Sequence, residues 1–173
     1  MTAENIEIIE GDITLAPVDA IVNAANQELR GGGGVDGAIQ KAAGPELLEA
    51  CRQIEAVNGV RCPFGEAVIT MGYNLPATYV IHTVGPIYQQ AEHPEKVLTA
   101  AYGNSLDIAL SHQCRSVAFP AISCGVYGYP PEEAAKISIS VCRREKYRGL
   151  KIYFYLFRKE LVEIWTKALE DGV

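Results

Sequence analysis

The sequence lacks the features of a membrane or secreted protein. No run in the 173 residues approaches the roughly 18 apolar residues that span a bilayer. The start, MTAENIEIIEGD, has no basic segment followed by an apolar one, so it predicts neither a secretory signal nor an Arg-rich transit peptide. We therefore expect a cytoplasmic protein with no membrane partner.

Paired cysteines and basic clusters are missing as well. The five cysteines are an odd number without CxxC spacing, and with the three histidines they form no metal-ligand pattern. This favours reduced thiols and no metal. The net charge of −6 argues against a protein that binds nucleic-acid backbones. With 49% hydrophobic and 21% charged residues, the chain has the composition of one folded domain, residues 1–173.

Strand and helix patterns alternate along the chain. Apolar and β-rich runs predict strands at Ile6–Glu10, Ala20–Ala24, Ala67–Met71, Tyr79–Val84, Ser116–Phe119 and Leu150–Phe157. Helical spacing predicts helices at Gly37–Gly44, Pro45–Ala56, Pro94–His112, Pro130–Cys142 and Lys159–Leu169. This alternation predicts an α/β fold with helices on both faces of a sheet.

A first glycine loop follows the second predicted strand. Residues 32–37 match a literal GxGxxG, and Glu55 lies at about the distance of the acidic residue in a dinucleotide fingerprint. In that fingerprint the first glycine directly follows the strand, whereas here residues 25–31 intervene. A carboxylate aimed at a pyrophosphate would also be repelled, so Asp36 should face something other than phosphate.

A second loop, residues 123–130, repeats the order strand, glycine loop, helix. Neither loop contains a lysine or arginine, and no GK[ST] is present, which excludes a Walker A site. A phosphate held here would be bound by backbone amides and a helix dipole. The alternative is that both loops are tight connections that need a positive φ.

Four other polar or aromatic residues each have two interpretations. The amides of Asn23 and Asn26 suit sugar hydroxyls or the capping of a turn. Asp12 suits a helix N-cap or the acceptor of an exocyclic amine. Phe157 suits the core or a stacked base.

His82 and Cys124 are weaker candidates. Apolar neighbours make His82 a core histidine rather than a general base. Cys124 would need an adjacent cation to act as a nucleophile, and none is near it in sequence.

Five motifs in order resemble one family. They are GDIT (11–14), IVNAAN (21–26), GGGGVDGAI (31–39), HTVGP (82–86) and FPAISCGVYGYP (119–130). Together they resemble the macrodomain, specifically its MacroD-type ADP-ribose hydrolase branch, nearly to Phe157. The resemblance implies a three-layer α/β/α domain around a mixed, largely parallel six-stranded sheet, with ADP-ribose along the strand ends.

The resemblance also implies a role for each site residue. Asp12 and the Ile13 backbone would contact adenine, with Phe157 against the ring. Asn26, Tyr127 and Asp36 would meet the distal ribose. The diphosphate would lie between Gly34 and Val35 on one side and Ser123, Cys124, Gly125, Val126 and Tyr127 on the other.

The activity implied is hydrolysis of esters on the distal ribose. The substrates would be O-acetyl-ADP-ribose and proteins mono-ADP-ribosylated on acidic side chains, with Asp36 and Asn26 as catalytic residues. Asp36 would act as a base toward water or as a charge that stabilises a cationic ribosyl centre. We expect a monomer that needs no cofactor, metal or nucleic acid.

Three departures from the branch and two other functions bear on this interpretation. Gln40 stands where the branch commonly has histidine, Cys124 where it has threonine or serine, and Arg158 where an acidic or small polar residue is usual.

A non-catalytic ADP-ribose reader would share the cleft but would not need Asp36. An NAD-type oxidoreductase would depend on the misplaced GxGxxG.

Overall fold

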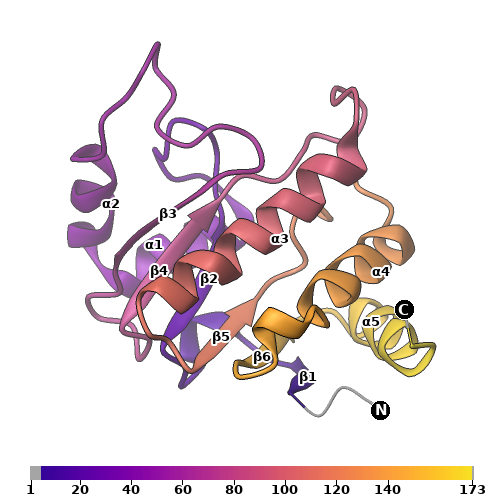
Figure 1. Cartoon of the computed structure of the whole chain (residues 1–173). Helices are drawn as coiled ribbons and strands as arrows, with labels where there is room; N and C mark the ends of the chain where they lie inside the picture. Colours follow the sequence, from indigo (N-terminus) through magenta and orange to yellow (C-terminus); the bar gives the residue numbers. More distant parts are fainter. Residues whose placement is uncertain (1–4, 173) are drawn as a thin grey trace.

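The computed structural model describes residues 5–172 and contains one six-stranded sheet (Figure 1). Residues 1–4 and residue 173 lie outside the described part. The prediction that the chain starts without a signal or transit peptide falls partly on residues 1–4. The strands are β1 (Ile6–Glu10), β2 (Ala20–Ala24), β3 (Ala67–Met71), β4 (Tyr79–Thr83), β5 (Ser116–Phe119) and β6 (Lys151–Leu156). Their order is β1-β6-β5-β2-β4-β3, and only the pairing of β3 with β4 is antiparallel. The expected mixed, largely parallel sheet is confirmed.

Strand position follows apolar content. The β2 sequence AIVNA is apolar on both faces apart from one asparagine, and β2 lies in the interior of the sheet between β5 and β4. The alternating IEIIE of β1 leaves acidic residues exposed, and β1 forms an edge.

Two helical layers cover the sheet. The helices are α1 (Gly34–Ala43), α2 (Pro45–Arg52), α3 (Pro94–Ser111), α4 (Pro131–Cys142) and α5 (Lys159–Glu170), with short 3-10 turns η1 (Ile13–Leu15) and η2 (Glu145–Tyr147). In Figure 1, α3 and α4 lie in front of the sheet and α1 lies behind it. The core divides in the same way, because α3, α4 and α5 pack into one apolar cluster while η1, α1 and α2 pack into another. The predicted three layers are therefore present.

Aromatic rings fill the front core. Phe119 and Phe154, on adjacent strands, stack with centroids 5.6 Å apart, and Tyr102 of α3 and Trp165 of α5 pack on them. Such pairs contribute about 0.5–1.5 kcal/mol each beyond the burial of their area. The Trp165 Nε1–H donates to Ser138 Oγ at 3.0 Å, so the buried indole keeps a partner.

Helices α1 and α2 differ from the predicted ranges. Helix α1 begins at Gly34 rather than Gly37, because the Gly37 N–H already donates to Gly33 O at 3.1 Å and closes a first turn. Helix α2 ends at Arg52 rather than Ala56. The Arg61 Nε–H donates to Ile54 O at 2.9 Å, so this carbonyl is used by the following loop rather than by a continued helix.

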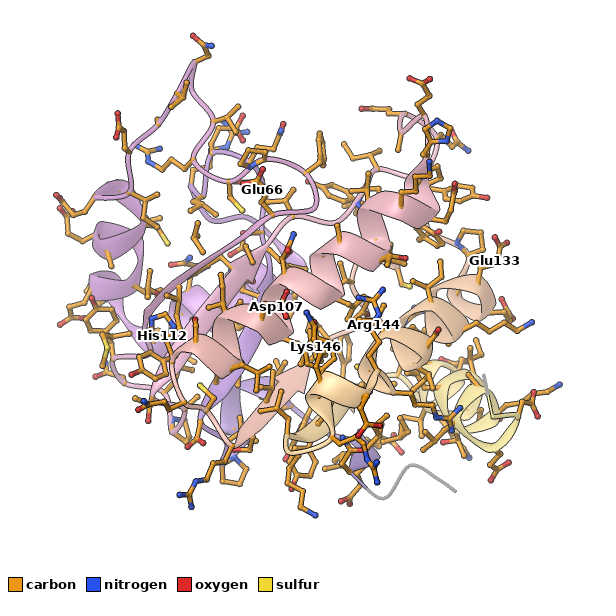
Figure 2. The ribbon with its side chains drawn as sticks, in the orientation of Figure 1. Glu66, Asp107, His112, Glu133, Arg144 and Lys146 are labelled. Carbon is orange, nitrogen blue, oxygen red and sulfur yellow. The ribbon has the colours of Figure 1, made fainter. Side chains whose placement is uncertain are left out.

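The front face carries a polar cluster that joins α3 to η2 (Figure 2). Lys146 Nζ lies 2.9 Å from Asp107 Oδ1, and the Tyr147 hydroxyl donates to the same oxygen at 2.7 Å. The ion pair is half exposed and so contributes at most about 1 kcal/mol.

Two sequence expectations concern thiols and membranes. All five cysteines are free, as expected for reduced thiols. Within residues 5–172, no helix combines the length and the apolarity that crossing a bilayer requires.

Candidate active site

A hollow of about 440 Å³ lies where the central parallel strands end. It is lined by segments that follow β2, β4 and β5: Ala24, Ala25, Asn26, Gly32, Gly33, Gly34, Val35, Asp36, Gly85, Ala121, Ser123, Gly125, Val126 and Tyr127. The chain leaves β2 toward β4 on one side and returns to β5 on the other, a switch point where α/β sheets bind ligands. The structure thus brings both glycine loops and Asp36 together.

The first loop presents backbone donors from the start of α1. The N–H groups of Gly33, Gly34 and Val35 have no acceptor within residues 5–172. Unpaired donors at a helix N-terminus, together with the helix dipole, favour an anion. No side chain caps this helix, so these donors stay free for a ligand.

The second loop presents a matching set. It is closed by Tyr129 N–H donating to Ser123 O at 2.8 Å, while the N–H groups of Gly125, Val126 and Tyr127 find no acceptor among the described residues. The expectation that the dipole of the following helix favours a phosphate at this loop is wrong. Helix α4 starts only at Pro131, carries two glutamates in its first turn and lines no part of the hollow.

Ser123 fixes the shape of the second loop. Its φ of 67° is left-handed, which is costly for a residue with a side chain. Its hydroxyl donates to Pro86 O at 2.8 Å and so holds the loop against the segment after β4. Only a glycine fits at position 85, since a Cβ there would meet Ser123 Oγ at 2.2 Å.

Asp36 lies in the first turns of α1 and is only 5% exposed. Its Oδ1 accepts a hydrogen bond from Asn23 Nδ2 at 2.9 Å. Burial raises the pKa of Asp36 above its ordinary value, while hydrogen bonds from Asn23 and Gln40 act in the opposite direction. The Asp36 carboxylate is therefore fixed in position by a hydrogen bond and is more basic than an exposed carboxylate.

Asn23 and His82 lie behind Asp36 rather than in the hollow. Asn23 is fully buried, so its predicted contact with sugar hydroxyls is wrong; its amide serves Asp36 instead. His82 is a buried histidine as expected, and burial lowers its pKa from 6.5 to about 4. It contacts Cys51 and not Cys124, so His82 does not serve as a base for the loop cysteine.

The buried imidazole should make folding sensitive to acid. Below pH 6.5 the unfolded chain protonates this histidine while the folded chain does not, so the free energy of unfolding should fall by about 3 kcal/mol between pH 6.5 and pH 4. Urea unfolding of wild type and His82→Asn across that range checks this. The raised pKa of Asp36 acts in the opposite sense but is common to both proteins. Equal acid sensitivity of the two would contradict the prediction.

Asn26 lines the hollow and also braces the first loop. Its Nδ2 donates to Gly31 O at 3.0 Å, and its Oδ1 accepts the Arg30 N–H at 3.1 Å. The turn-capping interpretation is therefore confirmed, and one Nδ2 hydrogen remains for a ligand.

The residues expected at adenine lie on the neighbouring strand ends, outside the hollow. Asp12 caps η1 by accepting from the Thr14 N–H at 2.9 Å, so its predicted N-cap role is confirmed. Ile13 is buried, and Phe157 is 76% exposed, which makes the core interpretation of Phe157 wrong. Because β1 and β6 are paired up to Glu10 and Leu156, Asp12 and Phe157 follow adjacent strands.

Cys124 and Arg158, which depart from the usual residues of the family branch, do not together make a reactive thiol. Burial raises the pKa of Cys124 to about 12, and the positive charge of exposed Arg158 lowers it only in part. The thiol therefore stays protonated at neutral pH, which disfavours a cysteine hydrolase.

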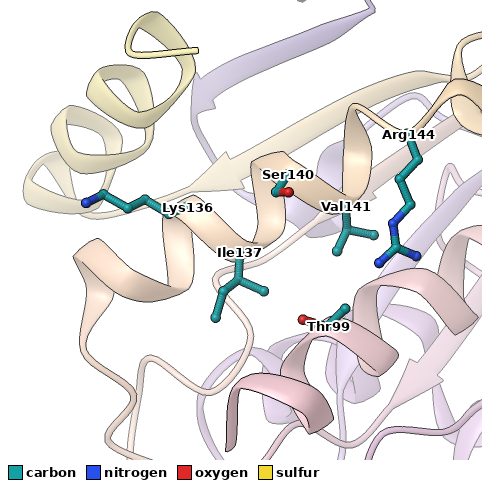
Figure 3. A pocket seen from close by; sticks show the side chains of 6 residues that line it. All are labelled: Thr99, Lys136, Ile137, Ser140, Val141 and Arg144. Carbon is teal, nitrogen blue, oxygen red and sulfur yellow. The ribbon is translucent and has the colours of Figure 1, made fainter. Parts of the chain in front are cut away.

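A second hollow, of about 370 Å³, lies between α3 and α4 (Figure 3). It is lined by Thr99, Lys136, Ile137, Ser140, Val141 and Arg144. Figure 3 shows Arg144 reaching toward α3, while Lys136 points away from it at the other end. The two cations therefore do not converge on one anion.

Sequence reasoning missed the small residues that shape the hollow. Gly85 lies in the HTVGP motif, where a glycine before a proline signals a turn but not a close approach between two loops. The link from Asn23 to Asp36 joins a strand to a helix 13 residues later and has no local pattern.

Comparison with known proteins agrees with this geometry. The family model for the Macro domain matches residues 22–138. A macro domain-containing protein of Vibrio parahaemolyticus is 58% identical over 95% of this chain and 96% of its own, and an O-acetyl-ADP-ribose deacetylase of Citrobacter rodentium is 52% identical over 95% and 94%.

Solved structures give the same answer. The Oceanobacillus iheyensis macrodomain with ADP superposes with a TM-score of 0.92 at 41% identity, covering 99% of this chain and 94% of that one. A Trypanosoma brucei macrodomain in complex with ADP-ribose superposes with a TM-score of 0.84 at 39% identity, covering 94% and 68%. With a family model over most of its length and close relatives over nearly all of it, the chain belongs to the macrodomain family.

Proposed function

We propose that this protein binds ADP-ribose and hydrolyses esters of its distal ribose, with O-acetyl-ADP-ribose and proteins mono-ADP-ribosylated on acidic side chains as substrates. The observation that carries the proposal is the buried carboxylate of Asp36 at the edge of a hollow whose two loops offer unpaired amide donors. The deacetylase named among the relatives supports the acetyl ester. The protein ester is the same chemical bond on a larger acyl group.

The ligand would lie along the ends of the strands. The diphosphate would rest between the amides of the two loops, and adenine would extend toward Asp12, Ile13 and Phe157 at the ends of β1 and β6. Phe157 is exposed enough to stack on a base, a contact worth about 1–3 kcal/mol. The distal ribose would then meet Asn26, Asp36 and Tyr127, which share the hollow.

Asp36 would act as a general base. The carboxylate takes a proton from water as the oxygen of that water adds to the ester carbonyl carbon. The tetrahedral intermediate then collapses, the bond from the carbonyl carbon to the ribose oxygen breaks, and Asp36 returns the proton to that oxygen, which gives a free carboxylic acid, ADP-ribose and the ionised Asp36. The raised pKa of Asp36 suits this role, because a stronger base removes the proton more readily. The backbone donors keep the diphosphate in place while the ester is cleaved.

Incubation with a glutamate-linked ADP-ribosylated protein, and separately with O-acetyl-ADP-ribose, tests the proposal. In water enriched in oxygen-18, attack at the carbonyl carbon places the label in the released carboxylic acid. With the protein ester, label at the anomeric oxygen and none in the released acid would mean attack at the anomeric carbon and would make Asp36 an electrostatic stabiliser. Tight ADP-ribose binding without cleavage of either ester would establish the reader function instead.

Binding should depend only weakly on salt. No lysine or arginine is among the described residues that line the hollow, so the diphosphate would be bound by dipoles rather than mobile side-chain charges. We expect the ADP-ribose dissociation constant from calorimetry to rise less than about threefold between 50 and 200 mM NaCl, far below the steep loss of a polycationic site. A loss of a hundredfold or more would contradict this binding mode.

A further inference from the structure

A chain of hydrogen bonds crosses the sheet and ends at Asp36. Thr70 Oγ1 on the edge strand β3 lies 2.9 Å from His82 Nε2 on β4, and His82 Nδ1 lies 3.2 Å from Asn23 Nδ2 on β2. The same Nδ2 donates to Asp36 Oδ1 at 2.9 Å. Asn23 and His82 are direct partners in the register of β2 and β4, so the sheet itself sets their spacing.

The direction of every bond in this chain follows from the charge of Asp36. An ionised carboxylate only accepts, so Asn23 must turn its NH₂ group toward it. The second hydrogen of that NH₂ then faces His82 Nδ1, which must accept and carry no proton. The ring proton therefore sits on Nε2 and is donated to the Thr70 hydroxyl.

The orientation of Asn23 leaves one atom unsatisfied. Its Oδ1 is buried and has no partner among the described residues. A rotated amide would turn this oxygen toward the carboxylate and the lone pair of the ring nitrogen, and both would repel it. The packing thus leaves a carbonyl oxygen unpaired while both amide hydrogens are used, one on Asp36 and one on His82.

We propose that His82, acting through Asn23, is the positioning residue for the Asp36 carboxylate. This inference rests on the proposed function, because it assigns Asp36 a catalytic task. His82 does not touch the substrate, since it is fully buried on β4 and does not line the hollow. Its acceptor nitrogen takes the second amide hydrogen of Asn23 and so reinforces the amide rotation that the carboxylate requires. The amide in turn donates to the carboxylate and favours its ionised form.

Few other groups compete for the titration of Asp36. The described groups that act on it are Gln40 of α1, Cys51 of α2 and Tyr127 of the second loop. Burial and the charge of Asp36 raise the pKa of Cys51 to about 11, and burial raises the pKa of Tyr127 above its usual 10. Both are neutral between pH 5 and 8, so neither adds a change of charge to the titration of Asp36 in that range.

The test compares three variants in steady-state ester hydrolysis from pH 4.5 to 8.5. His82→Leu removes the acceptor, and we expect kcat to fall about tenfold and the acid limb to move up by about one pH unit, with ADP-ribose affinity within threefold of wild type. His82→Asn places an amide oxygen where Nδ1 was and should recover most of the lost turnover. Val80→Ala, two residues along the same face of β4, controls for lost packing and should leave the limb in place.

Each result has one meaning. A wild type that cleaves no ester overturns the proposed function. A wild type that cleaves, together with a His82→Leu whose acid limb is unmoved, overturns the positioning role alone. If His82→Leu does not fold, carbon-13 NMR titration of the Asp36 carboxyl in ligand-free His82→Phe, which fills the volume of the ring without an acceptor nitrogen, decides: an upward shift of the Asp36 pKa supports the role, and an unchanged value overturns it.

Discussion

Asp36→Asn should lose about 10²–10⁴-fold in kcat for ester hydrolysis while binding ADP-ribose nearly as well as wild type, because it removes the base but keeps the shape of the site. It should also be at least as stable at pH 7. Burial raises the pKa of Asp36 in the folded protein, so the ionised carboxylate lowers stability at pH values above that pKa. A neutral amide of the same size avoids this cost and can still accept from Asn23.

Asp36→Ala separates these effects. It removes the same base but leaves the buried Asn23 amide without an acceptor, so it should cost about 1–3 kcal/mol in the free energy of unfolding. Asp19→Asn is the matched control: Asp19 lies at the other end of β2 and accepts the Arg115 N–H at 2.7 Å, far from the hollow. Full turnover in Asp36→Asn, measured beside urea unfolding of all three variants, would remove Asp36 from the reaction.

Gly85→Ala should disrupt the second loop. The added methyl would lie 2.2 Å from Ser123 Oγ and 2.5 Å from Ile122 Cγ2, so the loop must move. Such overpacking costs about 1–3 kcal/mol of stability. We also expect ADP-ribose affinity to fall at least about tenfold, as when one hydrogen bond to a charged group is lost.

Gly149→Ala gives the comparison for this variant. A methyl at position 149 meets no atom within 4 Å, and its backbone φ is not left-handed. Calorimetric titration with ADP-ribose and thermal unfolding should show wild-type affinity and stability for Gly149→Ala. For Gly85→Ala they should show a lower affinity and a lower stability. Unchanged affinity in Gly85→Ala would mean that the second loop does not hold the diphosphate.

The sequence predicted the sheet well because its signals are local. Runs such as AIVNA and KIYFYL carry their strand character within five or six residues, and all six strands match within one residue at each end. The start of α1 was predicted three residues late, since glycines carry little helix propensity and only a contact between Gly37 and Gly33 reveals the earlier turn.

The site was predictable in part. The sequence singles out Asp36, because a carboxylate in a phosphate-binding loop would be repelled by the phosphate and must face another group; in the structure it is a buried hydrogen-bond acceptor. The true neighbours of Asn23 were not predictable, because they depend on β2 and β4 lying side by side with Asn23 opposite His82. Long-range register of this kind leaves no trace in residue spacing.

The unpaired amides of the two loops have a further consequence. Peptide N–H groups neither gain nor lose protons in physiological buffers, whereas the carboxylate beside them does. Lowering the pH through the pKa of Asp36 should therefore slow turnover while the nucleotide stays bound. Below that pKa the protein would keep its nucleotide bound without cleaving the ester, and a return to higher pH would restore turnover without a new binding step.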